Sequence, residues 1–211
     1  MPSWNIIKKH LIDSDHKMEL LIKQYGISSF AKQLDKNVNL FDNLISSIVS
    51  QQLSTKVAST IKERLYKFGN INKFSPEFLI NASTEDLRSC GLSYAKCRSM
   101  KEIADIVQEE PDYLSSLKNK PEEFIIEKLI KLRGIGIWTA QMFQIFSLRH
   151  LDVFSTKDAG LIKGVRIVYF NKCNPSLDEI EKITKKWKPY RSIGSWYMWQ
   201  VANNEPPINK K

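Results

Sequence analysis

The 211-residue chain has few of the residues that build metal centres, with three cysteines and three histidines. The cysteines Cys90, Cys97 and Cys173 are scattered, whereas zinc and iron–sulfur sites need four ligands at characteristic short spacings. The histidines show no metal-binding spacing either. We therefore expect reduced, structural thiols and no iron–sulfur cluster.

Long apolar runs are also missing. No stretch approaches the ~18 apolar residues that a membrane-spanning helix needs, and Met1–Trp4 begin no apolar signal sequence. We expect no membrane partner, and a location in the cytoplasm near the nucleoid, or in the nucleus if the source is eukaryotic.

Acidic residues are the minority charge, with 23 Asp and Glu against 32 Lys and Arg and a formal net charge of +9. An excess of positive charge favours a polyanionic partner, because neutralised phosphates release counterions. Lysines that only solvate the surface, as at Lys185 and Lys186, would give the same balance. The charge alone leaves both interpretations open.

Glycine is scarce, yet Gly134 and Gly136 flank a single residue, Ile135. An apolar helical run ends before them, and a second begins at Ile137-Trp138, so the pattern predicts two helices joined by a turn. Glycines permit a positive φ and the close approach of another backbone. Free N–H groups at the start of the second helix would then bind an anion such as a DNA phosphate. A plain tight turn is the alternative.

A lone carboxylate, Asp158, lies twenty residues beyond Trp138 and precedes another helical pattern. A phosphate-binding turn followed by one acid indicates chemistry on a nucleic acid. Taken by itself, Asp158 also fits the ordinary position of a carboxylate at a helix N-terminus.

The remaining patterns predict an all-α fold of about ten helices, because apolar residues recur at helical spacing and no long β alternation occurs. An N-terminal amphipathic segment ends at Gly26 and must pack on a later part of the chain. From Leu40, two helical patterns flank residues 51–55, where Ser54 or Thr55 is the expected N-cap. We expect a frayed tail over residues 203–211.

Two further stretches are candidates for contact with a nucleic acid. Gln52 and Leu53 would lie at the junction of the two helical patterns, where side chains can point outward. A second glycine turn at Gly91 precedes Lys96, Arg98 and Lys101, which predicts a secondary contact with a phosphate backbone.

Five motifs in order carry a family resemblance: SSIVSQQLS, GLSYAKCRSM, LRGIGIWTA, the DVF…D stretch ending at Asp158, and WKPYRSIGSWYMW. Over about residues 40–199 the chain resembles the helix-hairpin-helix DNA glycosylases, most closely the DNA-3-methyladenine glycosylase II (AlkA-type) branch. The resemblance implies two helical subdomains with a cleft between them. Residues 1–36 and 151–211 would form one, and residues 37–150 the other, which carries the helix-hairpin-helix.

The resemblance also implies an activity on damaged double-stranded DNA. Such enzymes flip a nucleotide out of the duplex and hydrolyse the N-glycosidic bond of alkylated purines (3-methyladenine, 7-methylguanine), which leaves an abasic site. Asp158 would be the ionised catalytic acid, stabilising the cationic sugar or orienting water. Leu53 would be the wedge and Gln52 the plug. The other expected DNA contacts are Gly134, Ile135, Gly136, Thr139 and Lys157.

The resemblance implies a monomer that needs no cofactor, with a Na⁺ or K⁺ ion at the backbone carbonyls of Ile130, Leu132 and Ile135. Trp138 occupies the position of the nucleophilic lysine in bifunctional relatives, which predicts a monofunctional enzyme. Trp138 and Trp199 would attract a cationic purine, although core packing is the alternative for each. The other expected pocket residues are Met142, where AlkA-type relatives have tyrosine, and Ser54, where some have histidine.

Two alternatives remain at this stage. Lys157 departs from the family pattern beside Asp158, and an oxidised-base glycosylase with lyase activity would use it as an amine nucleophile. A non-catalytic helix-hairpin-helix module that recognises damage is the second. Asp158 argues against that module, because a carboxylate near DNA repels phosphate.

Overall fold

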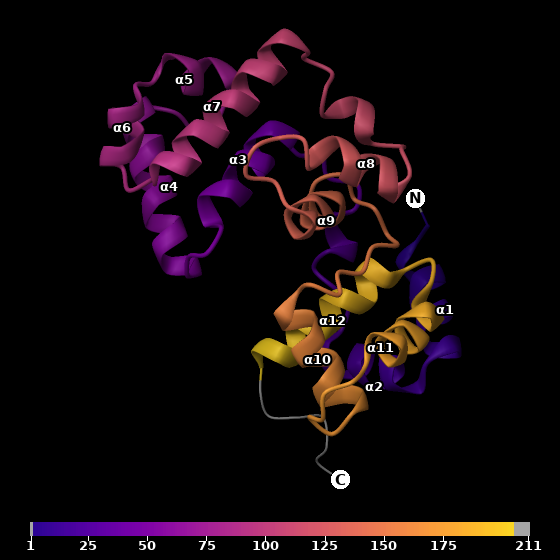
Figure 1. Ribbon diagram of the computed structural model, residues 1–211. Helices are drawn as coiled ribbons and strands as arrows, with labels where there is room; N and C mark the ends of the chain where they lie inside the picture. Colours follow the sequence, from indigo (N-terminus) through magenta and orange to yellow (C-terminus); the bar gives the residue numbers. More distant parts are fainter. Residues whose placement is uncertain (1, 205–211) are drawn as a thin grey trace. The chain divides into compact units, whose positions relative to one another are not determined.

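The computed structural model describes residues 2–204, and within that range every regular element is helical, with twelve α helices and three short 3-10 helices (Figure 1). The expected all-α class is confirmed. Of the expected frayed tail, residues 205–211 lie outside the described residues. No helix between residues 2 and 204 is long and apolar enough to cross a bilayer.

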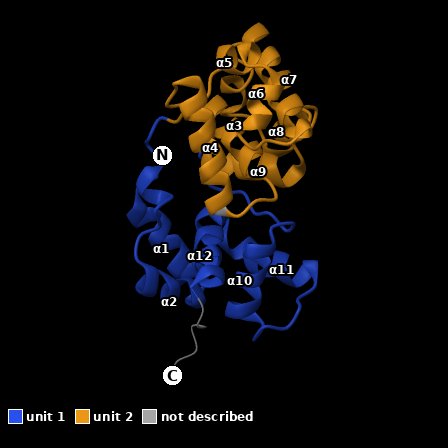
Figure 2. Cartoon of the chain, turned by 90° about the vertical axis from the view of Figure 1, so that its left-hand side faces the viewer, with its two compact units in different colours: residues 1–37, 149–211 blue, residues 38–148 orange. Residues whose placement is uncertain are grey.

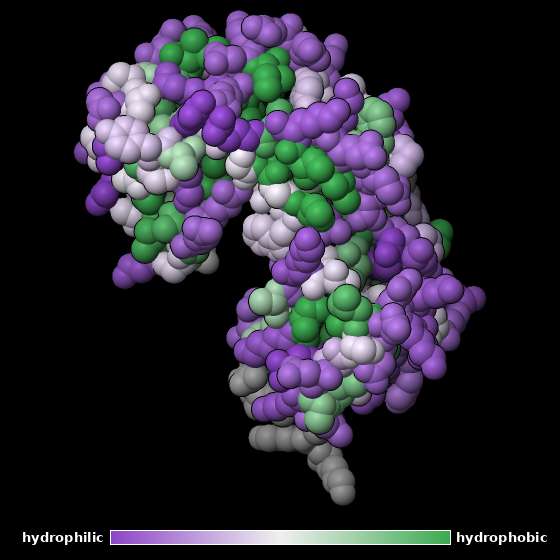
Figure 3. All heavy atoms as spheres, in the orientation of Figure 1, coloured by the Kyte–Doolittle hydropathy of each residue, from purple (hydrophilic) through white to green (hydrophobic). Residues whose placement is uncertain are grey.

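The chain divides into two compact units (Figure 2). Unit 1 joins residues 1–37 to residues 149–211, and unit 2 is the continuous segment 38–148. Hydrophilic residues cover much of the face drawn in Figure 3, as expected when 26% of the residues are charged.

Unit 1 is built from helices at both ends of the chain. Its elements are α1 (Trp4–Ser14), α2 (His16–Tyr25), η1 (Ala31–Gln33), α10 (Ala159–Tyr169), α11 (Leu177–Thr184), η3 (Lys185–Trp187) and α12 (Arg191–Asn203). α1 packs against η3 and α2 against α12, so the N-terminal segment does bury its apolar face on later elements. That segment is two helices, because Asp15 takes an extended conformation and caps α2 by accepting from the Lys17 N–H.

Asp15 also joins the N-terminal and C-terminal segments of unit 1 through hydrogen bonds. Its carboxylate is 7% exposed, and its Oδ2 accepts from the Tyr169 hydroxyl at 2.7 Å and the Trp187 indole N–H at 3.0 Å. Burial, with the nearby Asp15 charge, raises the pKa of Tyr169 well above its ordinary value. The phenol therefore stays protonated and remains a donor.

α10 and α12 lie against each other along unit 1. Gly164 makes this possible, because a Cβ at that position would collide with the backbone of Met198. The close approach brings the start of α10 next to the later turns of α12.

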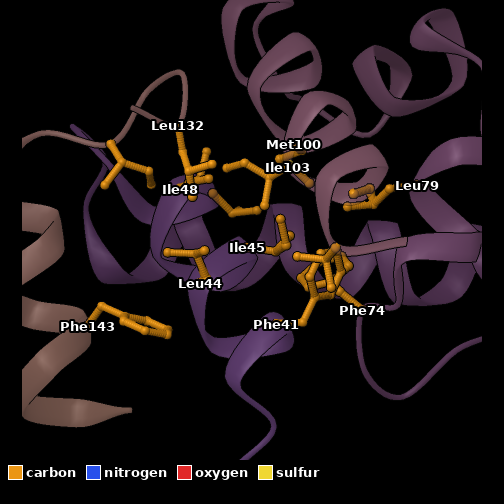
Figure 4. Close-up of a cluster of buried hydrophobic side chains, with 14 of the residues drawn as sticks. Phe41, Leu44, Ile45, Ile48, Phe74, Leu79, Met100, Ile103, Leu132 and Phe143 are labelled. Atoms are coloured by element: carbon orange, nitrogen blue, oxygen red, sulfur yellow. The ribbon is translucent and has the colours of Figure 1, made fainter. Parts of the chain in front are cut away.

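Unit 2 is organised around α3 (Leu40–Ser50). Its other elements are α4 (Thr55–Gly69), α5 (Pro76–Asn81), α6 (Thr84–Ser89), α7 (Tyr94–Glu109), η2 (Ser115–Leu117), α8 (Glu122–Leu129) and α9 (Ile137–Phe146). α3 buries the expected stripe of Phe41, Leu44, Ile45, Ile48 and Val49. Figure 4 shows the side chains of Phe41, Leu44, Ile45 and Ile48 beside partners from later parts of the chain: Phe74, Leu79, Met100, Ile103, Leu132 and Phe143.

Burial of one such side chain is worth about 1.5–3 kcal/mol. Leu132 precedes the paired glycines and Phe143 belongs to α9. Both belong to the cluster around α3, so the same core anchors the turn and the helix that follows it.

Candidate functional site

The turn predicted from the paired glycines joins α8 to α9 and spans residues 130–136, here called the hairpin turn. Gly134 has a φ of +80°, and a Cβ there would lie 2.7 Å from Ser99 Oγ. Gly136 is extended, and a Cβ there would meet nothing within 4 Å. Gly134 therefore makes the turn and its contact with α7 possible, whereas Gly136 leaves open space in front of α9.

The N-terminus of α9 has the features of an anion site. Its N-cap is Gly136, which offers no side chain to the first N–H groups of the helix, and such N–H groups bind phosphates readily. Ile137 and Trp138 lie beside them and are 39% and 40% exposed.

Residues 51–54, here called the wedge loop, join α3 to α4. Ser54 is the N-cap of α4, as predicted, and its Oγ accepts from the Val57 N–H at 3.4 Å. That hydroxyl is therefore engaged in capping, which the predicted pocket role did not include. Gln52 is exposed with a φ of +59°, a conformation that costs a non-glycine residue about 1–2 kcal/mol. Leu53 is 37% exposed.

Gln51 was not predicted, yet it joins the wedge loop to the hairpin turn. Its Nε2 donates to the Gly134 carbonyl at 2.9 Å and lies 3.2 Å from Thr139 Oγ1. Thr139 is 4% exposed, so its side chain lies inside unit 2 and not on the surface where DNA contact was expected. The side chain of Ile135 is also buried, at 5% exposed, which leaves its backbone for any contact.

The cations of the second glycine turn bind their own chain. Lys96 Nζ donates to the carbonyls of Val49 and Gln51, both at 2.8 Å, and burial lowers the pKa of its ammonium. Lys101 donates in the same way to two carbonyls at the end of α5, and Arg98 forms an ion pair within α7. Lys96 and Lys101 each use two of their three N–H donors on carbonyls of their own chain. The predicted contact of these residues with a phosphate backbone stays a prediction.

An ion pair between α7 and the hairpin turn adds to this support. Arg133 Nε lies 2.8 Å from Glu102 Oε2. The hydrogen bond from Arg133 holds the pKa of Glu102 below its ordinary value, and the bond from Arg98 acts in the same direction. Since both side chains are well exposed, the pair contributes little to stability, but it restricts the position of the turn.

Asp158 is the N-cap of α10 in unit 1. Its Oδ1 accepts two hydrogen bonds, from the Leu161 N–H at 2.8 Å and from the Trp199 indole N–H at 3.0 Å. The carboxylate is 8% exposed. A Cβ at Gly160 would lie 3.2 Å from both Asp158 Oδ1 and Trp199, so glycine there keeps room for this contact. The capping interpretation is confirmed, and the cap also fixes the side chain in one orientation.

Trp199 was predicted as a pocket aromatic, and the structure adds a hydrogen bond to the acid that the sequence did not reveal. Lys157, which directly precedes Asp158 in the sequence, is exposed. In unit 2, Trp138 and Met142 both belong to α9, and Met142 is 8% exposed.

Comparison with known proteins agrees with this arrangement. The HhH-GPD superfamily base excision DNA repair protein family matches residues 45–189. The alkylbase DNA glycosidase-like protein mag2 of Schizosaccharomyces pombe is 28% identical, over 97% of this chain and 94% of the relative. The DNA-3-methyladenine glycosylase 1 of the same organism is 30% identical over 96% and 90%.

A solved structure extends the agreement to three dimensions. The S. pombe 3-methyladenine DNA glycosylase Mag1, in complex with abasic DNA, superposes with a TM-score of 0.77 and 27% identity, covering 95% of this chain and 99% of that one. The hairpin turn, the wedge loop, α9 and Asp158 all lie within the matched residues 45–189. This chain belongs to the HhH-GPD superfamily of base excision DNA repair proteins.

Proposed function

We propose that this chain is a monofunctional DNA glycosylase that releases alkylated purines, 3-methyladenine and 7-methylguanine, from duplex DNA. The observation that carries the proposal is the Asp158 carboxylate, nearly buried and fixed by the N–H groups of Leu161 and Trp199. The names of the relatives, which include a DNA-3-methyladenine glycosylase, support the choice of substrate.

The reaction needs little more than a fixed negative charge. An alkylated purine already carries a positive charge, so it leaves with the electron pair of the N-glycosidic bond. The sugar then becomes cationic at C1′, and water adds there and releases a proton to the solvent, which gives the abasic product. The ionised Asp158 stabilises that cation or orients the water, and its charge acts strongly because water is largely excluded around it. Trp199 holds the carboxylate in place and leaves it no need to reorganise during the reaction.

DNA is held by unit 2 in this proposal. The N–H groups at the start of α9 bind a backbone phosphate in the open space at Gly136. Leu53 enters the gap left by the flipped nucleotide as a wedge, and Gln52 fills the rest of that gap as a plug. Flipping costs stacking energy, and contacts of the wedge with the neighbouring bases replace part of it. In unit 1, Lys157, exposed before α10, adds a further phosphate contact.

Trp138 contributes to substrate choice. Its indole is 40% exposed, and a cationic purine over its face would gain about 0.5–2 kcal/mol. An indole cannot form a Schiff base, so the strand is not cut at this position. Met142 lies one helical turn further along α9 and would give the pocket an adaptable apolar wall.

A monovalent cation fits the hairpin turn in this proposal. Its ligands would be the carbonyl oxygens of Ile130, Leu132 and Ile135, and oxygen ligands suit hard cations. The Leu132 carbonyl already accepts the Ile135 N–H at 3.1 Å, but a carbonyl has a second lone pair for an ion. The ion would shape the turn and takes no part in the chemistry.

The test compares the release of labelled bases from methylated duplex DNA by the wild type and by Asp158→Asn. Asparagine caps a helix as well as aspartate does and still accepts from Leu161 and Trp199, so the substitution removes the charge and keeps the fold. We expect base release to fall by about 10²–10³-fold, with DNA affinity and the melting temperature unchanged. Equal release by both proteins would refute the assigned role of Asp158.

Borohydride trapping completes the test, because only an enzyme that forms a Schiff base is trapped. We expect no covalent complex with the wild type. A trapped complex that disappears in Lys157→Ala would replace the proposal with the lyase mechanism.

A further inference from the structure

We propose that Gln51 is a positioning residue that locks the wedge loop to the hairpin turn, so that gripping the DNA backbone and filling the gap in the duplex occur together. The inference rests on the proposed function, which assigns those two tasks to these two segments. It concerns unit 2 alone.

The Gln51 side chain is the direct link between the two segments. One amide nitrogen lies 2.9 Å from the Gly134 carbonyl and 3.2 Å from Thr139 Oγ1. An Nε2 group has two hydrogens, so it can serve both acceptors at once. The first acceptor belongs to the hairpin turn and the second to the first turn of α9. Gln51 therefore contacts both the hairpin turn and the first turn of α9.

The backbone carbonyl of Gln51 is also bound, by a lysine of α7. Lys96 reaches from α7 and donates to the Gln51 carbonyl and to that of Val49, which belongs to the last turn of α3. Three elements, α3, α7 and α9, thus fix one residue. A segment held at both its side chain and its carbonyl has little freedom to shift along its partner.

The residue that follows shows why such support is needed. Gln52 has a positive φ, at +59°, and a strained backbone persists only where its surroundings over-determine it. The strained residue turns the chain so that Leu53 is exposed. Without the hydrogen bonds of the Gln51 side chain, the wedge loop could relax to a less strained conformation. The position of Leu53 would then no longer depend on the position of the hairpin turn.

A purely structural role for Gln51 is the alternative. Its bond to Gly134 lies at the surface, where water can replace the amide at little cost in stability. Its bond to Thr139 is partly buried, so a purely structural role would appear as lost stability, whereas a positioning role changes the rate at which the wedge enters the duplex. Misplacement by about 1 Å at such a site can lower a rate by 10²-fold.

The test uses Gln51→Met, which keeps the size of the side chain and removes both N–H donors. The probe is a duplex with a tetrahydrofuran abasic analogue beside 2-aminopurine, whose fluorescence rises when a wedge unstacks it. We expect the rate of this rise to fall at least tenfold, with affinity for undamaged duplex within twofold of the wild type. The matched control is Gln108→Ala, an exposed glutamine of α7, which should change neither quantity.

A double variant shows whether Gln51 acts through the wedge. In a Leu53→Ala background the wedge is already lost, so adding Gln51→Met should lower the rate by less than twofold. A further tenfold decrease in that background, or a wild-type rate for Gln51→Met alone, would overturn the inference. The probe carries no alkylated base, so its result is independent of whether the chain releases one.

Discussion

The substitution Asp15→Ala tests how unit 1 is held together. Asp15 is 7% exposed and is the shared acceptor of Tyr169 and Trp187, while its other oxygen caps α2. Loss of a helix cap costs about 1 kcal/mol. Each buried donor left without an acceptor costs about 1–3 kcal/mol. We therefore expect the free energy of unfolding to fall by about 3–7 kcal/mol.

The expected decrease is large enough to measure by two methods. For a unit of roughly 100 residues, 1 kcal/mol corresponds to about 4–8 °C in Tm, so Tm should fall by at least ~12 °C. Urea unfolding followed by tryptophan fluorescence gives the same free energy independently, and Trp187 itself reports on the contact.

Two matched variants isolate the cause. Asp15→Asn keeps a cap and a carbonyl acceptor, so its loss should be clearly smaller than that of Asp15→Ala. Asp13→Ala removes an exposed carboxylate two residues earlier and should stay within about 0.5 kcal/mol of the wild type. If Asp15→Ala also stays within about 1 kcal/mol, the argument from buried, unsatisfied donors is refuted.

Three further predictions concern the site. Gly134→Ala should lower the free energy of unfolding by about 1–3 kcal/mol, because it forces a positive φ on alanine. Gly136→Ala should leave urea unfolding unchanged and weaken binding to duplex DNA. Glu102→Gln removes the exposed ion pairs with Arg133 and Arg98, so its effect on stability at pH 7 should be small. That small difference from the wild type should be complete above the ordinary glutamate pKa of 4.5 and disappear as the pH falls through the lowered pKa of Glu102, which urea unfolding from pH 7 downward measures. Trp199→Phe removes the indole donor to Asp158, the proposed catalytic acid, and should lower kcat for base release about 10–100-fold. A change confined to KM would instead indicate a role in base stacking alone.

Local patterns predicted the all-α class, although they gave about ten helices where residues 2–204 hold twelve α helices. The apolar spacing from Leu40 onward, the capping serine Ser54 and the stop at Gly26 each act within a few residues, so the sequence displays them directly. The break at Asp15 was missed, because the apolar spacing continues through it and only the buried partners Tyr169 and Trp187 explain why the carboxylate lies there.

In the candidate site, too, features with a local sequence signature were predicted and contacts between distant residues were not. Gly134 and Asp158 were found because a turn and a cap have local signatures. The bonds from Gln51 to Gly134 and from Trp199 to Asp158 join residues 83 and 41 positions apart, and no spacing rule predicts such pairs. The bonds from Lys96 to the carbonyls of Val49 and Gln51 are of the same kind: the sequence shows a lysine near a glycine turn, but not the carbonyls that the fold brings to it.

The discontinuous course of unit 1 has a consequence for the newly made protein. The apolar faces of α1 and α2, with Ile7, Leu11 and Met18 fully buried in the finished structure, are synthesised first, but η3 and α12 that cover them come last. At about 5–20 residues per second, the ribosome needs roughly 3–13 s for residues 149–211. During that interval the segment 38–148 is complete and can fold, whereas the N-terminal helices must wait uncovered. The segment that we propose to bind DNA is thus complete on the ribosome before Asp158 has been synthesised.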